Sequence, residues 1–352
     1  MASGHGLHEA PRRELLPGVT RRAAVLVIGV LLLQLGFVLS YVGAFHAPAP
    51  RDVPLAVVAP PGAPAGTADQ VAAQLEGIAG DPLDVRVVDA EDDGRQLLAD
   101  RDVDGVLLLG TGTEDTLLVS SAEGGAVSSA LTEVLTRVDA AQQRTLTTDD
   151  ALPAATDDAR GLSAFYLAVG WVVGGYLVAS IIGVSAGSRP LTRARGVVRL
   201  GSLAVYAIVS GIGGALITGP VLGVFDGHLL ALSALGALLV FAVGAFTMAL
   251  QVWTGLVGIG LAILLFVILG NPSAGGAYPA PLLPPFWAGI GPWLPPGAGT
   301  SAVRGIVYFG GAGVGQAVLV LAAYAVVGLL ATLAGSGRHG TVEEREPVAV
   351  PA

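Results

Sequence analysis

The sequence predicts a polytopic α-helical membrane protein with six transmembrane helices and a small α/β extracytoplasmic domain inserted between the first two. Between Leu200 and Val303 the chain carries one formally charged side chain, Asp226. A bilayer favours such a stretch, because a charge at mid-depth costs several kcal/mol. Residues 46–160 have the opposite character, with 21 of the 27 acidic residues against seven arginines. A water-exposed domain and a membrane domain therefore alternate along one chain.

The overall composition excludes several kinds of site. The chain of 352 residues is 53% hydrophobic and contains no cysteine, so it can form no disulfide, thiolate metal site or cysteine nucleophile. All 18 basic residues are arginine. A Walker A loop needs a lysine that reaches the phosphates, so this chain cannot contain one. If the protein uses ATP, a separate subunit must hydrolyse it.

The predicted order begins with a cytoplasmic leader (residues 1–22), the first span (23–45) and the acidic domain (46–160). A five-helix domain (161–334) and a disordered cytoplasmic tail (335–352) follow. Apolar runs of about 20 residues match the hydrocarbon thickness of a bilayer. The predicted spans are Ala23–Phe45, Ala164–Gly187, Leu200–Val224, Leu229–Leu250, Gly255–Leu269 and Ile306–Ala334. The fifth is short and rich in glycine, and the glycines at 310, 311, 313 and 315 predict a break near the start of the sixth.

Arginine placement predicts the orientation. Arginines occur at 12, 13, 21 and 22 before the first span, and at 189, 193, 195 and 199 between the second and third. Cytoplasmic loops of membrane proteins carry such an excess of positive charge. We therefore expect a protein of the bacterial plasma membrane, with both arginine-rich segments and both termini on the cytoplasmic side. A cleaved signal peptide is the rival interpretation of the first span. Its apolar run is longer than a normal signal sequence, and Pro48 and Pro50 crowd the cleavage region, which favours an uncleaved anchor.

Residues 46–160 read as a small α/β domain, because short apolar runs alternate with helical patterns. The extended segments expected are Val53–Ala59, Leu83–Val88, Gly105–Leu109 and Thr116–Ser120, and the helical ones are Ala68–Ile78, Asp92–Ala99 and a long Ala126–Thr147. The acidity of this domain is explained either by solubility or by a surface that binds cations. Its densest acidic cluster is Asp89, Glu91, Asp92 and Asp93. The spacing does not match a calcium loop, so no metal site is expected.

The loop Asn271–Val303 is the most unusual segment of the chain. It contains eight prolines and two of the four tryptophans but no charged residue. Irregular backbone at membrane depth is tolerated only against protein or a wet cavity, so we expect short helices that fold back into the membrane domain. If this loop is a re-entrant exit gate, the candidate residues are Asn271, Pro272, Pro284, Pro285, Trp287 and Trp293. The alternative is a plain belt of tryptophans at the membrane surface.

Several of these segments resemble one family. The run from Gly270 to Gly311 is similar to the segment before the last span of type-2 ABC exporter permeases, in the branch that includes the phage infection protein. The resemblance extends to VPLAVV at 53–58, DVDGVLLL at 102–109 and FYLAVGWVVGGYL at 165–177. It implies one span, a large exterior domain and five further spans. It also implies a subunit that dimerises and works with a separate ATPase.

In such permeases a cytoplasmic helix between spans two and three docks on the ATPase. Ser188–Arg199 occupies that place here, with Ser188 as an expected N-cap and Pro190 in the first turn. Its arginines Arg189, Arg193, Arg195 and Arg199 are candidates either for coupling to the ATPase or for contact with anionic lipid. Glycine pairs that permit close helix approach occur at 170/174, 219/223 and 311/315. They are explained either by packing within one chain, which is the favoured interpretation, or by a homodimer, which the resemblance to the family also implies.

The remaining function classes have little support in the sequence. The five histidines are scattered, which disfavours an enzyme, and no catalytic residue, cofactor or nucleic-acid partner is expected. A proton-driven exporter needs titratable groups in the membrane, and only Asp226 and His228 are near it, in a loop. The favoured function is the permease-like subunit of an exporter for a hydrophobic or envelope-related substrate. The alternative is a membrane receptor or envelope scaffold that acts through its acidic domain.

Overall fold

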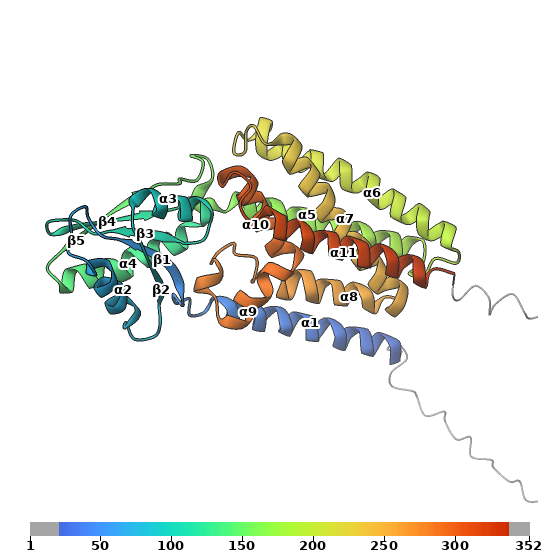
Figure 1. The fold of residues 1–352 in the computed structure, drawn as a ribbon. Coiled ribbons are helices and arrows are strands. Elements are labelled where there is room, and N and C mark those ends of the chain that lie inside the picture. Colours follow the sequence, from blue (N-terminus) through green and yellow to red (C-terminus); the bar gives the residue numbers. More distant parts are fainter. Residues whose placement is uncertain (1–20, 338–352) are drawn as a thin grey trace, which may run out of the picture.

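The computed structural model describes residues 21–337, so the leader arginines Arg12 and Arg13 and most of the predicted tail lie outside the described part. A helical bundle occupies one end of the molecule and an α/β domain the other (Figure 1). We call the end of the bundle next to the α/β domain the domain end, and the opposite one the far end. Helix α1 (Arg21–Phe45) begins at the far end, and α11 (Val314–Gly335) finishes there.

Five described helices are long and apolar enough to cross a membrane, so the chain is a polytopic helical membrane protein. They are α1, α5 (Ser163–Ser185), α6 (Arg193–Leu216) with its π-helical continuation η3 (Ile217–Val221), α7 (Leu229–Thr254) and α11. The segment expected to form the fifth span is shorter than these five helices. It consists of α8 (Val257–Ile263) and the π-helical η4 (Leu264–Leu269), whose 13 residues rise only about 20 Å.

The chain between η4 and α11 turns back into the bundle. The short helices η5 (Ala280–Leu282), α9 (Pro285–Ile290) and η6 (Gly291–Trp293) lead into α10 (Pro295–Tyr308), which is buried along most of its length. Helix α10 packs against α5, α7 and α11 and runs back towards the α/β domain. The predicted break before the last span is therefore confirmed, with α10 ending at Tyr308 and α11 beginning at Val314.

Helix α7 forms the centre of the bundle and contacts α5, α6, α10 and α11. Glycines at these crossings let backbones meet directly. A Cβ at Gly211 of α6 would lie 2.4 Å from the Ser233 carbonyl oxygen of α7. A Cβ at Gly328 of α11 would lie 2.4 Å from the Phe246 backbone nitrogen. At these two crossings glycine thus serves packing within one chain.

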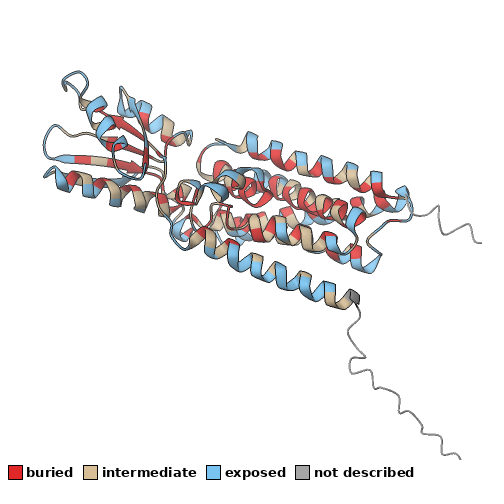
Figure 2. Cartoon of the chain, turned by 90° about the horizontal axis from the view of Figure 1, so that it is seen from below, coloured by how far each residue is buried: buried red, intermediate tan, exposed pale blue. Residues whose placement is uncertain are grey.

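Helix α1 is set apart from the other spans. Most of its length is exposed (Figure 2), and its contacts are to α8, η4 and the segment around α9. Near the domain end, the Ser40 hydroxyl donates a hydrogen bond to the Ile268 carbonyl, and the Trp287 indole N–H donates to Ser40 Oγ. A Cβ at Gly43 would lie 3.0 Å from the Trp287 ring. Glycine at this position therefore lets the tryptophan pack directly against the backbone of α1.

The α/β domain contains one five-stranded sheet in the order β2-β1-β3-β4-β5. Its strands are β1 (Val53–Val58), β2 (Leu83–Val88), β3 (Gly105–Leu108), β4 (Glu114–Val119) and β5 (Thr145–Asp150). Strand β1 pairs in parallel with β2 and β3, β4 runs antiparallel to β3, and β5 runs parallel to β4. Helices α2 (Thr67–Glu76) and α4 (Gly125–Ala141) cover one face of the sheet, and α3 (Glu91–Ala99) packs on the other.

Two local predictions are wrong. The helix expected over Ala126–Thr147 ends at Ala141, and β5 follows it. The threonines of β5 favour a strand, and their pairing with β4 stabilises it, although helical periodicity alone predicted a helix there. The helix expected to begin at Ser188 begins instead at Arg193, where the Thr192 hydroxyl accepts a hydrogen bond from the Arg195 N–H. The segment before it is a loop, and the arginines at 193, 195 and 199 belong to the first turns of α6.

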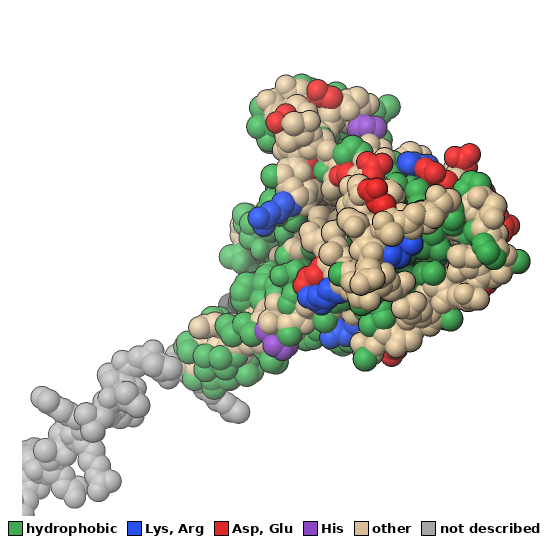
Figure 3. Space-filling model, turned by 90° about the vertical axis from the view of Figure 1, so that its left-hand side faces the viewer, with side chains coloured by type: hydrophobic (Ala, Val, Ile, Leu, Met, Phe, Trp, Pro, Cys, Tyr) green, Lys and Arg blue, Asp and Glu red, His purple; other side chains and the backbone are tan. Residues whose placement is uncertain are grey.

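The structure explains the densest acidic cluster without a ligand. Glu91, Asp92 and Asp93 form the first turn of α3, where negative charge stabilises the positive end of the helix dipole. Elsewhere on the domain, acidic side chains are spread between arginines and neutral residues on the surface seen in Figure 3. The two interpretations of the domain's acidity, solubility and a cation-binding surface, both stay predictions.

The glycine contacts lead to a first prediction. Gly211→Ala should destabilise the bundle by about 1–3 kcal/mol, because the new methyl group meets the backbone of α7. The control is Gly201→Ala in the same helix, where a Cβ meets nothing within 4 Å. There alanine should be neutral or slightly stabilising, because it favours the helix over glycine. Thermal melting of both purified variants measures the difference, and equal melting temperatures would contradict the close α6–α7 crossing.

Candidate functional site

The α/β domain and the bundle meet at a buried arginine. Arg304 lies in α10, and its side chain is almost fully buried. Its Nη2 donates hydrogen bonds to the carbonyl oxygens of Gly275 (3.0 Å) and Gly161 (3.4 Å). Its Nη1 lies 3.8 Å from Oε1 of Glu123, in the α/β domain. A buried charge requires a partner, so Arg304 fixes the domain against α10.

Glu123 is shared between two arginines. Arg101 binds it in a bidentate manner, with Nε to Oε2 and Nη2 to Oε1 both at 2.9 Å. The Nη1 of Arg101 donates to the Ser301 carbonyl in α10 (3.2 Å), and its guanidinium lies 5.2 Å from the centre of the Phe309 ring. Arg101 lies in the turn after α3 and has φ 65°, in the left-handed region of the backbone. This conformation places its side chain at the contact with Glu123. Two cations on one carboxylate thus bridge the two parts of the molecule.

A second carboxylate completes the contact. Asp158 is buried, and its Oδ1 accepts a hydrogen bond from the Ser163 N–H at the start of α5 (2.7 Å). Its Oδ2 accepts one from the Tyr308 hydroxyl at the end of α10 (2.7 Å). Asp158 therefore ties the first turn of α5 to the last turn of α10. We call these five residues the junction cluster: Arg101, Glu123, Asp158, Arg304 and Tyr308.

Two glycines let the backbone approach Arg304. Gly161 has φ 66°, and a Cβ there would lie 2.8 Å from the Ser121 carbonyl oxygen. Gly124 has φ 126°, and a Cβ there would lie 3.4 Å from Nη2 of Arg304. Both positions need the conformational freedom of glycine.

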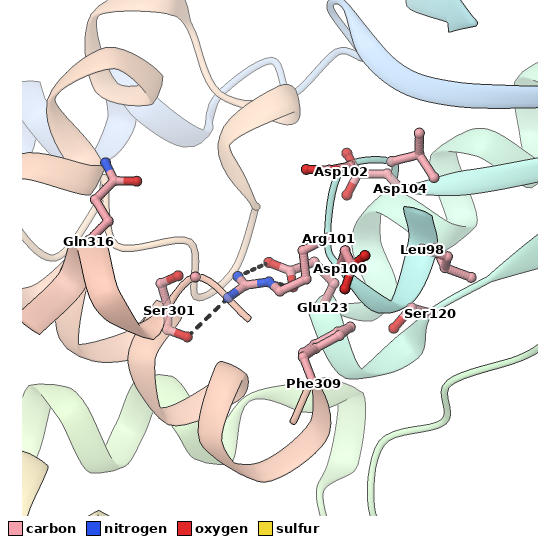
Figure 4. A pocket seen from close by; sticks show the side chains of 12 residues that line it. Leu98, Asp100, Arg101, Asp102, Asp104, Ser120, Glu123, Ser301, Phe309 and Gln316 are labelled. Carbon is pink, nitrogen blue, oxygen red and sulfur yellow. Dashed lines mark hydrogen bonds and ion pairs between the residues drawn. The ribbon is translucent and has the colours of Figure 1, made fainter. Parts of the chain in front are cut away.

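A polar cavity of about 390 Å³ lies beside the junction cluster. Figure 4 shows Arg101 and Glu123 close to Phe309, with Ser301 and Gln316 of the bundle on the other side of Arg101. Asp104, directly before β3, also lines the cavity and is partly buried. Desolvation, reinforced by the charge of Glu123 and opposed by Arg101, raises the pKa of Asp104 from 3.8 to about 7.

A mostly apolar groove of about 560 Å³ runs between α5 and α6 and opens to the outside of the bundle. We call it the α5–α6 groove. Its lining residues include Ser163, Tyr166, Gly170, Trp171, Ser210, Gly213 and Val224. At its deeper end, the Trp171 indole N–H donates to the Ser210 carbonyl. At the domain end it reaches Ser163, whose N–H is bound by Asp158, so the groove leads up to the junction cluster.

The structure divides the candidate gate residues. Pro284 and Pro285 begin α9, and Trp287 of this helix binds α1. The Asn271 side chain lies beside the Tyr41 hydroxyl of α1. These residues therefore hold α1, whereas α10, from the same loop, reaches the junction cluster. Pro272 is buried beside Asn271, and Trp293 is exposed at the end of η6.

The four candidate arginines do gather at one place, the far end. Arg189 Nε donates to the Val252 carbonyl, and Arg199 donates to the carbonyls of Ala186 and Gly187. Arg193 and Arg195 are exposed on the first turn of α6. Asp226 and His228 lie in the loop before α7 at the opposite end.

Sequence reasoning overlooked Arg304, although the sequence contained a signal for it. Arg304 is one arginine between two long apolar runs, and an ionisable residue within a membrane segment is by default a functional candidate. Its partners could not be found in the same way, because Arg101, Glu123 and Asp158 are ordinary surface residue types in an acidic domain.

Comparison of the chain with protein families, curated proteins and solved structures finds no match in any of the three. The resemblance to type-2 exporter permeases therefore stays a prediction.

The shared carboxylate gives a second prediction. Glu123→Gln should destabilise the protein by about 3 kcal/mol, because it leaves two arginines at a mostly buried site without their anion. Glu133→Gln is the matched control, since Glu133 pairs with Arg137 on the largely exposed surface and its loss should cost less than about 1 kcal/mol. Melting in detergent compares the two. An equal small effect would show that the junction cluster does not hold the domain.

Asp104 gives a third prediction, about pH. Folding raises its pKa, so between pH 3.8 and about 7 the folded chain holds this proton more tightly than the unfolded chain. Stability should therefore fall as pH rises through this window and then level off. Asp104→Asn, which stays uncharged, should raise the melting temperature at pH 8 by a few degrees and change little at pH 4.5. Asp102→Asn, on the exposed neighbour, is the control, and an Asp104→Asn effect equal at both pH values would contradict the assignment.

Proposed function

We propose that the chain is the permease-like subunit of an exporter that moves a hydrophobic or envelope-related substrate outward, with ATP hydrolysed by a separate subunit. One observation carries the proposal. The apolar α5–α6 groove opens to the outside of the bundle between two of the spanning helices, and it reaches Ser163, whose N–H is bound by Asp158 of the junction cluster. A hydrophobic molecule can enter such a groove from the bilayer without passing through water.

The shape of the groove fits an elongated apolar molecule. Gly170 and Gly213 leave its walls open, since a Cβ at either position meets nothing within 4 Å. Tyr166 is 64% exposed and offers an aromatic surface with a hydroxyl at the domain end. An apolar wall with a few polar groups is typical of ligand sites.

The junction cluster supplies a mechanical link for export. Asp158 joins α5, one wall of the groove, to α10, and Arg304 joins α10 to the α/β domain. A shift of α5 against α6 would thus be transmitted to the domain. Within the loop 271–303, we assign the moving part of the gate to α10. Trp287 and the prolines at the start of α9 hold the loop against α1.

The ATPase partner and the homodimer are further parts of the proposal. The exposed Arg193 and Arg195 of the far end are the candidate docking surface for the ATPase, and they lie on the first turn of α6 and not on a separate helix. Among the glycine pairs, Gly311 lies in the turn before α11 and Gly174 packs against Tyr206. Gly315 meets nothing within 4 Å and can take part in contacts between subunits, whereas Gly170 lines the α5–α6 groove.

The second candidate function is a membrane receptor or scaffold. The polar cavity beside Arg101 and Asp104 favours it, because a ligand bound there would touch both the domain and the bundle. Purification from native bacterial membranes distinguishes the two functions. A nucleotide-binding subunit that co-purifies supports the permease, and its absence in mild detergents, with ligand binding retained by the domain, supports the receptor.

The groove gives a fourth prediction. Gly213→Leu should fill it and weaken the binding of a dansyl-labelled fatty acid to the purified chain about tenfold, or ~1.4 kcal/mol. Gly201→Leu, in the same helix and also in open space, is the control and should bind like the parent chain. Fluorescence titration gives both affinities, and equal binding by the two variants would rule out the groove as the apolar site.

A further inference from the structure

A crevice of about 780 Å³ lies at the far end of the bundle, between the start of α1 and the turn that joins α7 to α8. We call it the basic crevice. It is lined by Val25 and Leu26 of α1, by Gly255, Leu256 and Val257 of the turn, and by Ser188 and Arg189. Most of these residues are apolar, and the two polar ones come from the loop before α6.

The crevice is the wide end of a wedge between α1 and α8–η4. Three glycines spaced by seven residues lie on one face of α1. A Cβ at Gly43 would touch Trp287 at 3.0 Å, and one at Gly36 would reach Ile268 at 3.9 Å. A Cβ at Gly29 would meet nothing within 4 Å. Helix α1 still touches α8 at Leu33, which a Cβ at Gly260 would meet at 3.6 Å, and it parts from α8 beyond that point, towards the far end. An apolar wedge of this kind inside a bilayer has to be filled by lipid chains.

Arg189 determines which lipid headgroup fits. Its Nε is fixed by the Val252 carbonyl near the end of α7, at 3.2 Å, which holds the guanidinium at the opening of the crevice. The other three arginines of the loop and of α6 lie at the same end. The described acidic residues lie in the α/β domain, except Asp226 before α7. The described surface around the crevice is therefore positive, and a guanidinium binds phosphate well.

We propose that the basic crevice binds one anionic phospholipid, with its phosphate on Arg189 and an acyl chain in the wedge beside Gly29. A second copy of the chain is a poorer occupant. In a parallel arrangement it would bring its own arginines to this level, so charge would oppose its entry. The site is independent of the export proposal, because a receptor or scaffold would hold the same lipid.

The test compares phosphatidylglycerol with phosphatidylcholine of identical acyl chains, by native mass spectrometry of the full chain in detergent. The parent chain should retain phosphatidylglycerol at least about fivefold better. Arg189→Gln should lose most of this preference. Arg195→Gln removes the same charge from an exposed site outside the crevice and should keep it.

A second variant tests the wedge without a change of charge. Gly29→Leu should lower the retention of both lipids, because its side chain occupies the space of the acyl chain. Equal losses in Arg189→Gln and Arg195→Gln would mean diffuse attraction to the membrane surface and would overturn the proposal. Equal retention of the two lipids by the parent chain would do the same, as would unchanged retention in Gly29→Leu.

Discussion

The buried charge of Arg304 is the constraint on which the arrangement of the two parts depends. A guanidinium in a helix surrounded by apolar spans is costly unless anions and carbonyl oxygens surround it. The bundle supplies the Gly275 carbonyl, and the connection to α5 supplies that of Gly161. The carboxylate comes from the α/β domain, as Glu123. Each part of the molecule thus completes a site that the other leaves unsatisfied, and the domain is held against α10.

This constraint also organises the loop before the last span. Its prolines and tryptophans have two separate roles, since α9 fastens α1 and α10 returns through the bundle to the domain. The shared link at Asp158 connects α10 with the helix that forms one wall of the α5–α6 groove. The charged junction and the apolar groove are therefore neighbours.

The features that depend on composition could be predicted from the sequence, and those that depend on tertiary pairing could not. Long apolar runs predicted six spans, of which the structure has five helices long enough to cross a membrane and one shorter, and the glycines at 310–315 predicted the break before α11. Strand β5 was missed because a short run of threonines is decided by its partner strand. The start of α6 was misplaced because Thr192 and Ser188 are equally good caps by residue type. The junction cluster joins residues up to about 200 positions apart, which periodicity cannot relate.

The central claim is that Arg304 and Glu123 act on each other across the boundary between bundle and domain. A double-mutant cycle with Arg304→Gln, Glu123→Gln and the combined variant measures this interaction directly from the unfolding free energies. We expect the double variant to be about 1–3 kcal/mol more stable than the sum of the single effects predicts, because each residue is costly without the other. Strictly additive effects would contradict the claim and leave the domain attached by other contacts.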